Sequence, residues 1–170
     1  LIDINLDKRF NEMEFIFPVS SFKVSALKKA FEKSDIRFKT SGYVNRVSKL
    51  TTESFQGFLK GFIDLVIQHK GKWYIVDYKS NYLGSTYKHY SQDAMFEAMS
   101  DHHYFLQYYL YLVALHRYLE LRLPTYDYDT HFGGVFYLFI RGMHPEFGSK
   151  YGVFHDRPAK KVIQDLSDNL

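Results

Sequence analysis

The sequence contains no cysteine among its 170 residues, which excludes disulfide bonds, thiolate zinc sites and iron–sulfur clusters from the segment. It has no apolar run long enough to cross a membrane and no recognisable signal peptide, so we expect a cytoplasmic protein. No GxxxxGK[ST] loop is present, which excludes ATP binding through a P-loop. No repeat, low-complexity tract or linker rich in Pro, Gly or Ser divides the chain, and its length suits a single domain over residues 1–170.

Aromatic residues are abundant: they make up 19% of the chain, with 15 tyrosines and 16 phenylalanines against one tryptophan. This share suits a core rich in rings, and it also suits a wet binding groove, because tyrosine combines a ring with a hydroxyl. The net charge of +3 and the pI near 8.9 are compatible with a phosphate-backbone partner, although many unrelated proteins share them. The chain begins at Leu1 without Met, and we expect it to be a piece of a longer protein.

Hydrophobic periodicity predicts an α/β domain with a mixed sheet flanked by helices. The clearest feature is a β-hairpin over residues 57–79, whose two apolar runs flank the turn His69–Lys72 and predict two central strands. The remaining predictions are a strand at 12–18, a helix at 23–33 capped by Ser20 or Ser21, irregular chain at 35–54, helices at 91–99 and 101–123, the second stopped by Pro124, a buried strand at 133–140, and a tail of loop and edge strand.

The hairpin predicts which side chains face one another. If the turn is centred between Lys70 and Gly71, the numbers of paired residues sum to a constant, and Asp64 lies opposite Asp77. Like charges at directly opposed positions repel, so this pair needs a compensating cation. Lys79 lies on the same face as Asp77, and a hard divalent metal with oxygen ligands is the other candidate. The hairpin alone leaves open whether these residues form a metal site or a buried structural charge network.

Gly61-Phe62-Ile63-Asp64, followed by Asp77-Tyr78-Lys79, resembles the GxxD…(D/E)xK signature of the PD-(D/E)xK nuclease superfamily. The longer stretch GFIDLV…GKWYIVDYKSNYLG, the pair Gln107/Tyr111 in the form QxxxY, and the later HFGGVFYLFIRG resemble the nuclease domains of RecB-type helicase–nucleases. The resemblance runs from Glu12 to Pro158 and implies a restriction-endonuclease-like core. AddA-type nuclease domains are the nearest alternative family.

The resemblance implies a site built on Asp64, Asp77 and Lys79. Asp64, Asp77 and the backbone carbonyl of Tyr78 would bind Mg²⁺, with Mn²⁺ as a substitute, and Lys79 would orient or deprotonate the attacking water. Gln107 and Tyr111, at i, i+4 spacing, would face one phosphate or the metal-site edge. Without the family match, this pair reads as an ordinary polar contact on a buried helix. Glu14 matches an acidic residue on the first strand of these nucleases.

The chain departs from the family pattern in one respect. RecB-like nucleases carry a histidine metal ligand on a helix before the first strand, whereas no histidine precedes Glu12 here. His102 and His103 lie elsewhere and are expected to face solvent or to cap a helix. We therefore expect that the upstream helix and the helicase domains are absent from this segment, and that the isolated segment cleaves DNA weakly or not at all.

The basic residues are less informative. One set could line a DNA path, although scattered surface charge explains most of it equally well. The set comprises Lys72, Lys88, His89, Arg117, Arg141 and Lys150. The segment Ser80-Asn81-Tyr82 directly follows the expected catalytic strand and is placed to touch the substrate backbone.

Two hypotheses of different class follow. The first is a magnesium-dependent DNA exonuclease and endonuclease domain, acting on double- and single-stranded DNA within a complex that processes double-strand ends for recombinational repair. The resemblance implies RecC and RecD subunits as partners of such a domain. The second is an interaction module that docks those subunits and loads the RecA recombinase. Loss of cleavage on substitution of Asp77 distinguishes the two.

Overall fold

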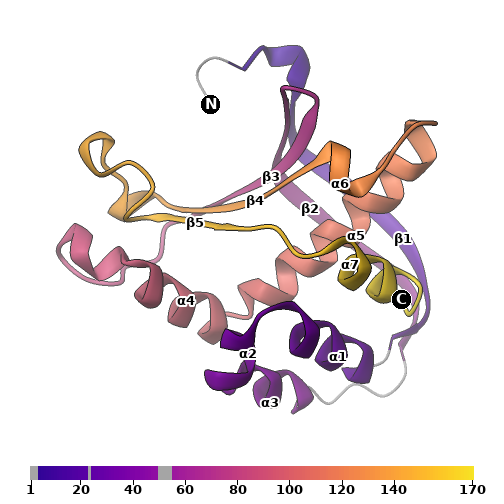
Figure 1. The fold of residues 1–170 in the computed structure, drawn as a ribbon, viewed down its shortest axis with the longest axis horizontal. Coiled ribbons are helices and arrows are strands. Elements are labelled where there is room, and N and C mark those ends of the chain that lie inside the picture. The colour runs from indigo at the N-terminus through magenta and orange to yellow at the C-terminus, as the bar shows by residue number, and fades with distance from the viewer. Residues whose placement is uncertain (1–3, 23, 50–54) are drawn as a thin grey trace. The chain divides into compact units, whose positions relative to one another are not determined.

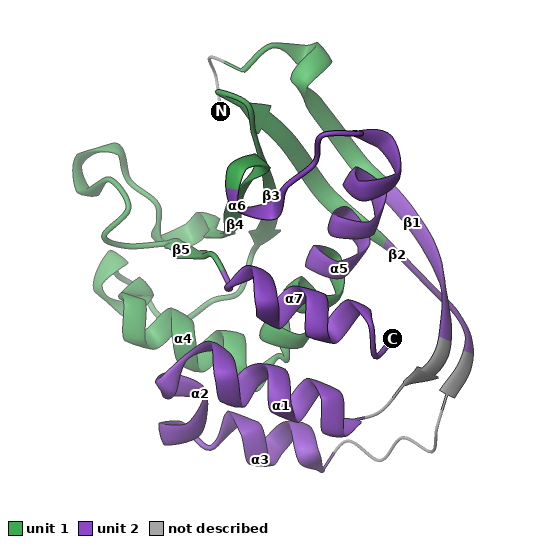
Figure 2. Cartoon of the chain, turned by 45° about the vertical axis from the view of Figure 1, so that its right-hand side comes forward, with its two compact units in different colours: residues 1–13, 62–111, 130–157 green, residues 14–61, 112–129, 158–170 purple. Residues whose placement is uncertain are grey.

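The computed structural model describes residues 4–22, 24–49 and 55–170, which fall into two compact units (Figures 1 and 2). Unit 1 comprises residues 1–13, 62–111 and 130–157, and unit 2 comprises residues 14–61, 112–129 and 158–170. Each unit is therefore assembled from segments that are distant in the sequence.

The described strands form one five-stranded sheet in the order β1-β2-β3-β4-β5, and their bounds are Arg9–Phe22, Phe55–His69, Lys72–Lys79, Phe132–Phe139 and Val153–Asp156 (Figure 1). β2 and β3 pair antiparallel, β3 and β4 parallel, and β4 and β5 antiparallel. The predicted mixed sheet, the central position of the hairpin strands and the edge strand in the tail are all confirmed.

The β2–β3 hairpin has the predicted register. The paired residues run from Leu65↔Val76 to His69↔Lys72, and each pair has the predicted constant sum. The two turn residues, Lys70 and Gly71, have φ angles of 49° and 78°. Positive φ at both central positions defines a type I′ turn, whose twist matches that of the flanking strands. The turn therefore fixes the register that the pattern predicted.

β1 is longer than predicted. The strand continues past Pro18 to Phe22, so Ser20 and Ser21 belong to it, and the predicted helix cap at these serines is wrong. Proline has no N–H to give to a ladder and is tolerated in strands at a sheet edge, where one side needs no partner. β1 is an edge strand, which explains why Pro18 does not end it.

The helices confirm three predictions and correct two. The helices predicted at 23–33, 91–99 and 101–123 correspond to α1, α4 and α5. Two short helices, α2 and α3, occupy most of the region predicted to be irregular, and a further helix, α7, ends the chain. The bounds are α1 Val24–Ser34, α2 Ile36–Thr40, α3 Tyr43–Ser48, α4 Gln92–Asp101, α5 Tyr104–Arg122, α6 Tyr128–His131 and α7 Lys160–Ser167, with 3-10 turns at Leu6–Lys8, Tyr87–Tyr90, Ile140–Gly142 and Pro145–Phe147. Residues 50–54 of the irregular prediction lie outside the described residues.

Unit 1 has an aromatic core beneath the sheet. Phe105 packs against Phe96 of α4 and Phe154 of β5, with ring centroids 4.8 and 5.7 Å apart. Tyr108 and Tyr137 are fully buried beside them, with centroids 5.9 Å apart. Within unit 1, the abundance of rings thus serves the core first.

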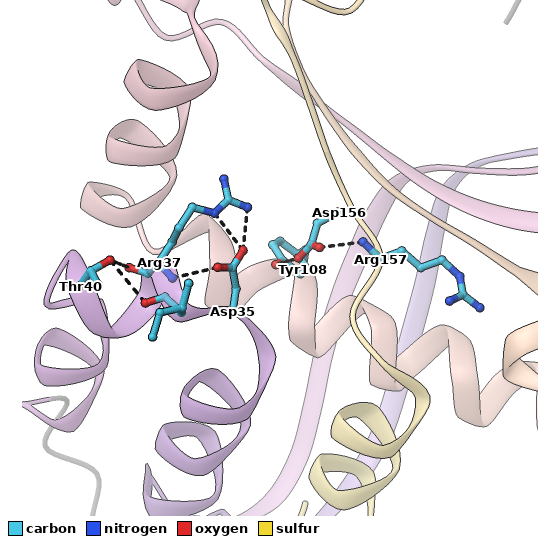
Figure 3. A network of polar contacts seen from close by, with 7 residues as sticks. Asp35, Arg37, Thr40, Tyr108, Asp156 and Arg157 are labelled. Atoms are coloured by element: carbon cyan, nitrogen blue, oxygen red, sulfur yellow. Dashed lines mark hydrogen bonds and ion pairs between the residues drawn. The ribbon is translucent and has the colours of Figure 1, made fainter.

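Unit 2 has its own aromatic core among its helices. Phe31 of α1 contacts Phe38 of α2 and Tyr43 of α3, with both pairs of centroids 5.1 Å apart. The short helix α2 begins at Asp35, whose side chain accepts a hydrogen bond from the backbone N–H of Arg37 at 2.8 Å (Figure 3). Capping satisfies an N–H that the first turn leaves free, which lets a helix this short persist.

The helices within the described ranges differ in length and hydropathy, and a helix needs about 20 mostly apolar residues to cross a bilayer. None of them is both long and apolar enough to span a membrane.

Candidate active site

Asp77 lies near the carboxyl end of β3 and is almost fully buried, with 1% of its surface exposed. Burial raises the pKa of its carboxyl group to about 6, because desolvation disfavours the charged form and the nearby Asp64 adds repulsion. Lys79 opposes this rise through a hydrogen bond and its charge, but does not cancel it. Asp77 is therefore held in a place where its negative charge is incompletely compensated.

Asp64 approaches β3 from the adjacent strand. The regular register of β2 and β3 ends at Leu65↔Val76, one step before Asp64 would meet Asp77. Beyond that point, Asp64 Oδ2 accepts a hydrogen bond of 3.1 Å from the backbone N–H of Tyr78. The side chain of Asp64 is exposed, so the carboxylate pair has one buried and one solvent-facing member.

Lys79 lies at the end of β3 with its ammonium group enclosed. Its Nζ atom is 2.6 Å from Asp77 Oδ2 and donates a 3.0 Å hydrogen bond to Gln107 Oε1. The same atom lies 3.9 Å from the ring centroid of Tyr104 and 5.0 Å from that of Tyr137. Since aromatic faces attract cations, the two rings hold a positive charge in a largely dry environment.

Gln107 is fixed by three hydrogen bonds in its side chain. Its Oε1 accepts from Lys79 and, at 3.0 Å, from the hydroxyl of Tyr137, while its Nε2 donates to the hydroxyl of Tyr111 at 2.9 Å. Burial and the charges of Asp77 and Asp64 raise the pKa of Tyr111 to about 12. Both carbonyl lone pairs of Gln107 are in use, so its direct role is to position Lys79.

The structure thus brings together all five residues singled out in the sequence, in unit 1, and adds two that were missed. Tyr104 and Tyr137 surround Lys79 from α5 and β4. Tyr104 precedes Gln107 by three positions, a helical spacing that places both on one face and that would have revealed it. Tyr137 pairs with Asp77 across the parallel strands β3 and β4, a contact that only the tertiary structure supplies.

Asp156, a second carboxylate in unit 1, has a hydrogen bond on each of its oxygens. Asp156 accepts hydrogen bonds from the hydroxyl of Tyr108 at 2.5 Å and from the backbone N–H of Arg157 at 2.7 Å, one on each oxygen (Figure 3). By contrast, no donor with good hydrogen-bond geometry faces the buried Oδ2 of Asp77 among the described residues, where the ion pair with Lys79 is its contact. Asp156 is thus held by two neutral donors, whereas the partner of Asp77 Oδ2 is the cation of Lys79, 2.6 Å away.

The residues fit a divalent cation with oxygen ligands. Asp77 offers a buried carboxylate whose pKa is raised by burial, and Asp64 offers an exposed carboxylate on the facing strand. Hard cations such as Mg²⁺ take few protein carboxylates and complete their shell with water and substrate phosphate. No group of three or more His, Asp or Glu side chains suited to metal binding occurs in the described parts of the chain. A site with only two carboxylates therefore suits Mg²⁺, which takes its other ligands from water and phosphate. It does not suit a cation that needs all its ligands from the protein.

The other residues named from the sequence have more ordinary places. Glu14 belongs to unit 2 and forms an ion pair with Lys60. His102 ends α4, where its backbone N–H donates to the carbonyls of Ala98 and Ser100, so the predicted capping role is confirmed. Arg117 is half-buried in unit 2 and donates to Ser167, which makes it structural rather than part of a DNA path.

The class of protein follows from comparison with a known family. A family model described as the PD-(D/E)XK nuclease superfamily matches residues 6–168, nearly the whole chain. The chain belongs to this superfamily, and the predicted fold class is confirmed.

The most informative relatives are full-length bacterial proteins. The chain is 54% identical over 117 residues to RecBCD enzyme subunit RecB of Haemophilus influenzae, which covers 69% of the chain and 10% of that relative. It is 54% identical over 108 residues to the subunit of the same name from Escherichia coli, covering 64% of the chain and 9% of the relative. With RecB of Buchnera aphidicola subsp. Baizongia pistaciae it is 37% identical over 175 residues, covering 95% and 14%.

These relatives confirm the predicted resemblance to RecB-type nuclease domains. They also set its scope, because the chain spans only about a tenth of the length of the curated relatives that it matches. What the whole relatives do is therefore broader than what this chain contains.

Proposed function

We propose that the chain is the magnesium-dependent DNA nuclease domain of a RecBCD-type helicase–nuclease, acting in the cytoplasm on DNA ends. The observation that carries this proposal is the buried carboxylate of Asp77, which faces Asp64 and Lys79 and has a pKa raised by burial. Strongly perturbed acids with a specific charge partner cluster at functional sites. Nucleases of this superfamily generally use divalent metal ions, which supports the same reading.

The protein groups have distinct parts in this proposal. Asp64, Asp77 and the carbonyl of Tyr78 would hold Mg²⁺ or Mn²⁺, which when bound polarises the scissile phosphate and lowers the pKa of its water. Lys79 Nζ orients the attacking water and stabilises negative charge that develops on the phosphate oxygens. Gln107 keeps Lys79 in place, and Tyr111 in turn orients Gln107. Enclosure by Tyr104 and Tyr137 excludes water and strengthens these interactions.

We further propose RecC- and RecD-type subunits as partners and the processing of double-strand ends for recombinational repair as the role. The name of the relatives, RecBCD enzyme subunit RecB, supports the partners. Loading of a RecA recombinase is a second candidate function from the resemblance, and it is compatible with cleavage by the same domain.

The test replaces Asp77 by the isosteric, uncharged asparagine in the full chain, assembled with its partner subunits. Cleavage of linear DNA in magnesium should fall by at least about a thousandfold, because both a metal ligand and the partner of Lys79 are lost. The matched control is Asp165→Asn in unit 2, which removes a carboxylate paired with Lys33 on the surface. Cleavage by Asp77→Asn at the rate of the control would overturn the proposal and leave the docking role.

A further inference from the structure

Two loops continue from the parallel strands that carry the candidate site. The 80–91 loop follows β3 and the 140–152 loop follows β4, and since parallel strands end at the same edge of a sheet, both loops leave from the edge where Asp77 and Lys79 lie. In sheets of this kind, ligands bind at the carboxyl ends of the strands. The loops are therefore the first surfaces that a substrate next to Lys79 would meet.

The two loops form one body. Arg141 Nε donates to the carbonyl of Ser80 at 2.8 Å, and the N–H of Gly152 donates to the carbonyl of Tyr90 at 3.0 Å. The rings of Tyr87 and Phe147 stack with centroids 4.2 Å apart. These contacts fix the loops to each other, so that side chains on their surface have defined positions.

A direct chain of contacts joins this body to the catalytic lysine. The ring of Tyr104 lies against Lys79 Nζ, and the hydroxyl of Tyr104 donates to Asn81 Oδ1 at 3.2 Å. The carbonyl of Asn81 in turn accepts from the hydroxyl of Tyr90 at 3.3 Å. The N–H of Leu83 donates to the same hydroxyl at 3.2 Å, so the backbone of Tyr82 is anchored on both sides within a few residues of the site.

Tyr82 leaves 69% of its surface exposed. Neither its hydroxyl nor its ring has a contact with another polar group or ring among the described residues. The exposed ring of Tyr82 does not contribute to the core. Its burial against another planar group would be favourable, because it removes apolar surface from water. Nucleic-acid bases provide such a partner.

The charge of the two loops fits the same partner. They contain Lys88, Arg141 and Lys150 against the single acid Glu146, whereas the whole chain has 22 basic and 19 acidic residues. None of the three cations forms an ion pair with a carboxylate within the described ranges, and all three are exposed. A surface that combines unpaired cations with a projecting ring is the usual composition of a site for single-stranded nucleic acid.

We propose that these loops form a platform for single-stranded DNA, in which Tyr82 stacks on an unpaired base next to the scissile phosphate and Lys88 and Lys150 contact the neighbouring phosphates. The inference rests on the proposed nuclease function and names the side chains outside the metal site that would hold the strand. Stacking requires an accessible base face, which duplex DNA does not offer except at its ends. The platform therefore favours an unpaired strand over an intact duplex.

The test measures binding of a fluorescein-labelled oligothymidylate of about 16 nucleotides to the full chain by anisotropy, in EDTA to prevent cleavage. Tyr82→Ala should weaken binding by about fivefold or more, because loss of one stacked base has this size, and Tyr82→Phe should bind as the wild type does. Binding of a duplex of the same length should be unchanged. The matched control is Tyr118→Ala on α5, a tyrosine with 38% of its surface exposed.

A second series separates the charges from the ring. Lys88→Ala and Lys150→Ala should each lower the slope of log affinity against log salt by about 0.7, the value for one phosphate of a single strand. Lys161→Ala on α7 should leave the slope unchanged. Because these side chains are exposed, unfolding does not explain a loss, and equal thermal midpoints confirm it.

The outcomes distinguish the two proposals. If the wild type cleaves DNA in magnesium but Tyr82→Ala binds the oligonucleotide like the wild type, the platform is wrong and the nuclease proposal stands. Equal losses for single strand and duplex, or for Tyr118→Ala, also overturn the platform. Absence of cleavage by the wild type within its complex overturns the nuclease proposal instead, whatever the binding result.

Discussion

Buried polar groups are treated differently in the two units of this protein. In the described part of unit 2, Arg117 donates to Ser167 and lies over the ring of Phe17 at 4.7 Å, and His116 contacts the hydroxyl of Tyr126 at 3.1 Å, so both have partners of complementary kind. In unit 1, the buried carboxylate of Asp77 forms an ion pair with Lys79, and the charge of the nearby Asp64 raises the pKa of Asp77 further. The first arrangement is complete in itself, whereas the second has an excess of negative charge.

Two aspartates show the contrast most directly. In unit 2, the hydrogen bond from Arg37 holds the pKa of Asp35 below its usual value, so folding favours the charged form. In unit 1, burial raises the pKa of Asp77, so folding disfavours the charged form. We infer that a structural acid such as Asp35 lies where neighbouring groups stabilise its charged form. A functional acid such as Asp77 lies where burial destabilises the charged form until a cation binds.

The largest effect that would sharpen this comparison is stabilisation by metal. Adding Mg²⁺ or Mn²⁺ at about a hundred times its dissociation constant should stabilise the wild type by roughly 2.7 kcal/mol, because the ion binds only the folded site. Asp77→Asn should lose this response, and Asp165→Asn in unit 2 should retain it. The measurement is the midpoint of thermal unfolding with and without metal. An equal response in both variants would place the metal outside the Asp64/Asp77 pair.

An intermediate effect should follow from releasing Lys79. Gln107→Leu removes the acceptor that holds the ammonium group, and we expect kcat to fall by about 10- to 100-fold with KM little changed, because Gln107 acts through Lys79 rather than on the DNA. Gln164→Leu on α7 is the matched substitution in unit 2. If KM rises while kcat is kept, Gln107 contacts substrate directly and the positioning role is wrong.

The smallest effect belongs to unit 2 and depends on pH. Burial lowers the pKa of His116, so the folded state resists protonation of this side chain more than the unfolded state does. The contribution of His116 to stability is therefore complete above its ordinary pKa of about 6.5 and is lost as the pH falls below that value. Urea unfolding of the wild type and of His116→Gln between pH 7.5 and 5 would reveal it, since the variant should have a flatter profile. Identical profiles would mean that His116 does not titrate in this range.

The parts of the fold that were predicted are those with long or strictly repeated patterns. The hairpin over residues 57–79 has two apolar strands and a Lys-Gly turn. The apolar pattern of the strands and the residue types of the turn both predict the register that the structure has. The long helix α5 has nineteen residues, apolar on most sides, before Pro124. In both cases, local preference and tertiary structure agree.

The parts that were missed are short. Helices α2 and α3 have five and six residues, which is less than two turns and too few for a period to be visible. Helix α7 does carry a signal, because Val162, Ile163 and Leu166 are buried on one side, but the nearby prolines and glycines suggested loop. At the candidate site, the hairpin predicted that Asp64, Asp77 and Lys79 lie together and the family resemblance predicted their roles, whereas the enclosure of Lys79 by Tyr137 depends on the pairing of β3 with β4.

The β2–β3 hairpin also determines where this domain can change length. Residues added between Asp64 and the turn change the number of residues that separate Asp64 from the turn. Because side chains alternate between the two faces of a sheet, a single insertion would move Asp64 to the opposite face. Residues added at Lys70 and Gly71 lie beyond the last ladder pair, His69↔Lys72, and leave that count intact. The tip of the hairpin is therefore the natural place for an inserted segment, a fluorophore or an affinity tag, whereas an insertion within residues 65–69 or 72–76 would shift the register.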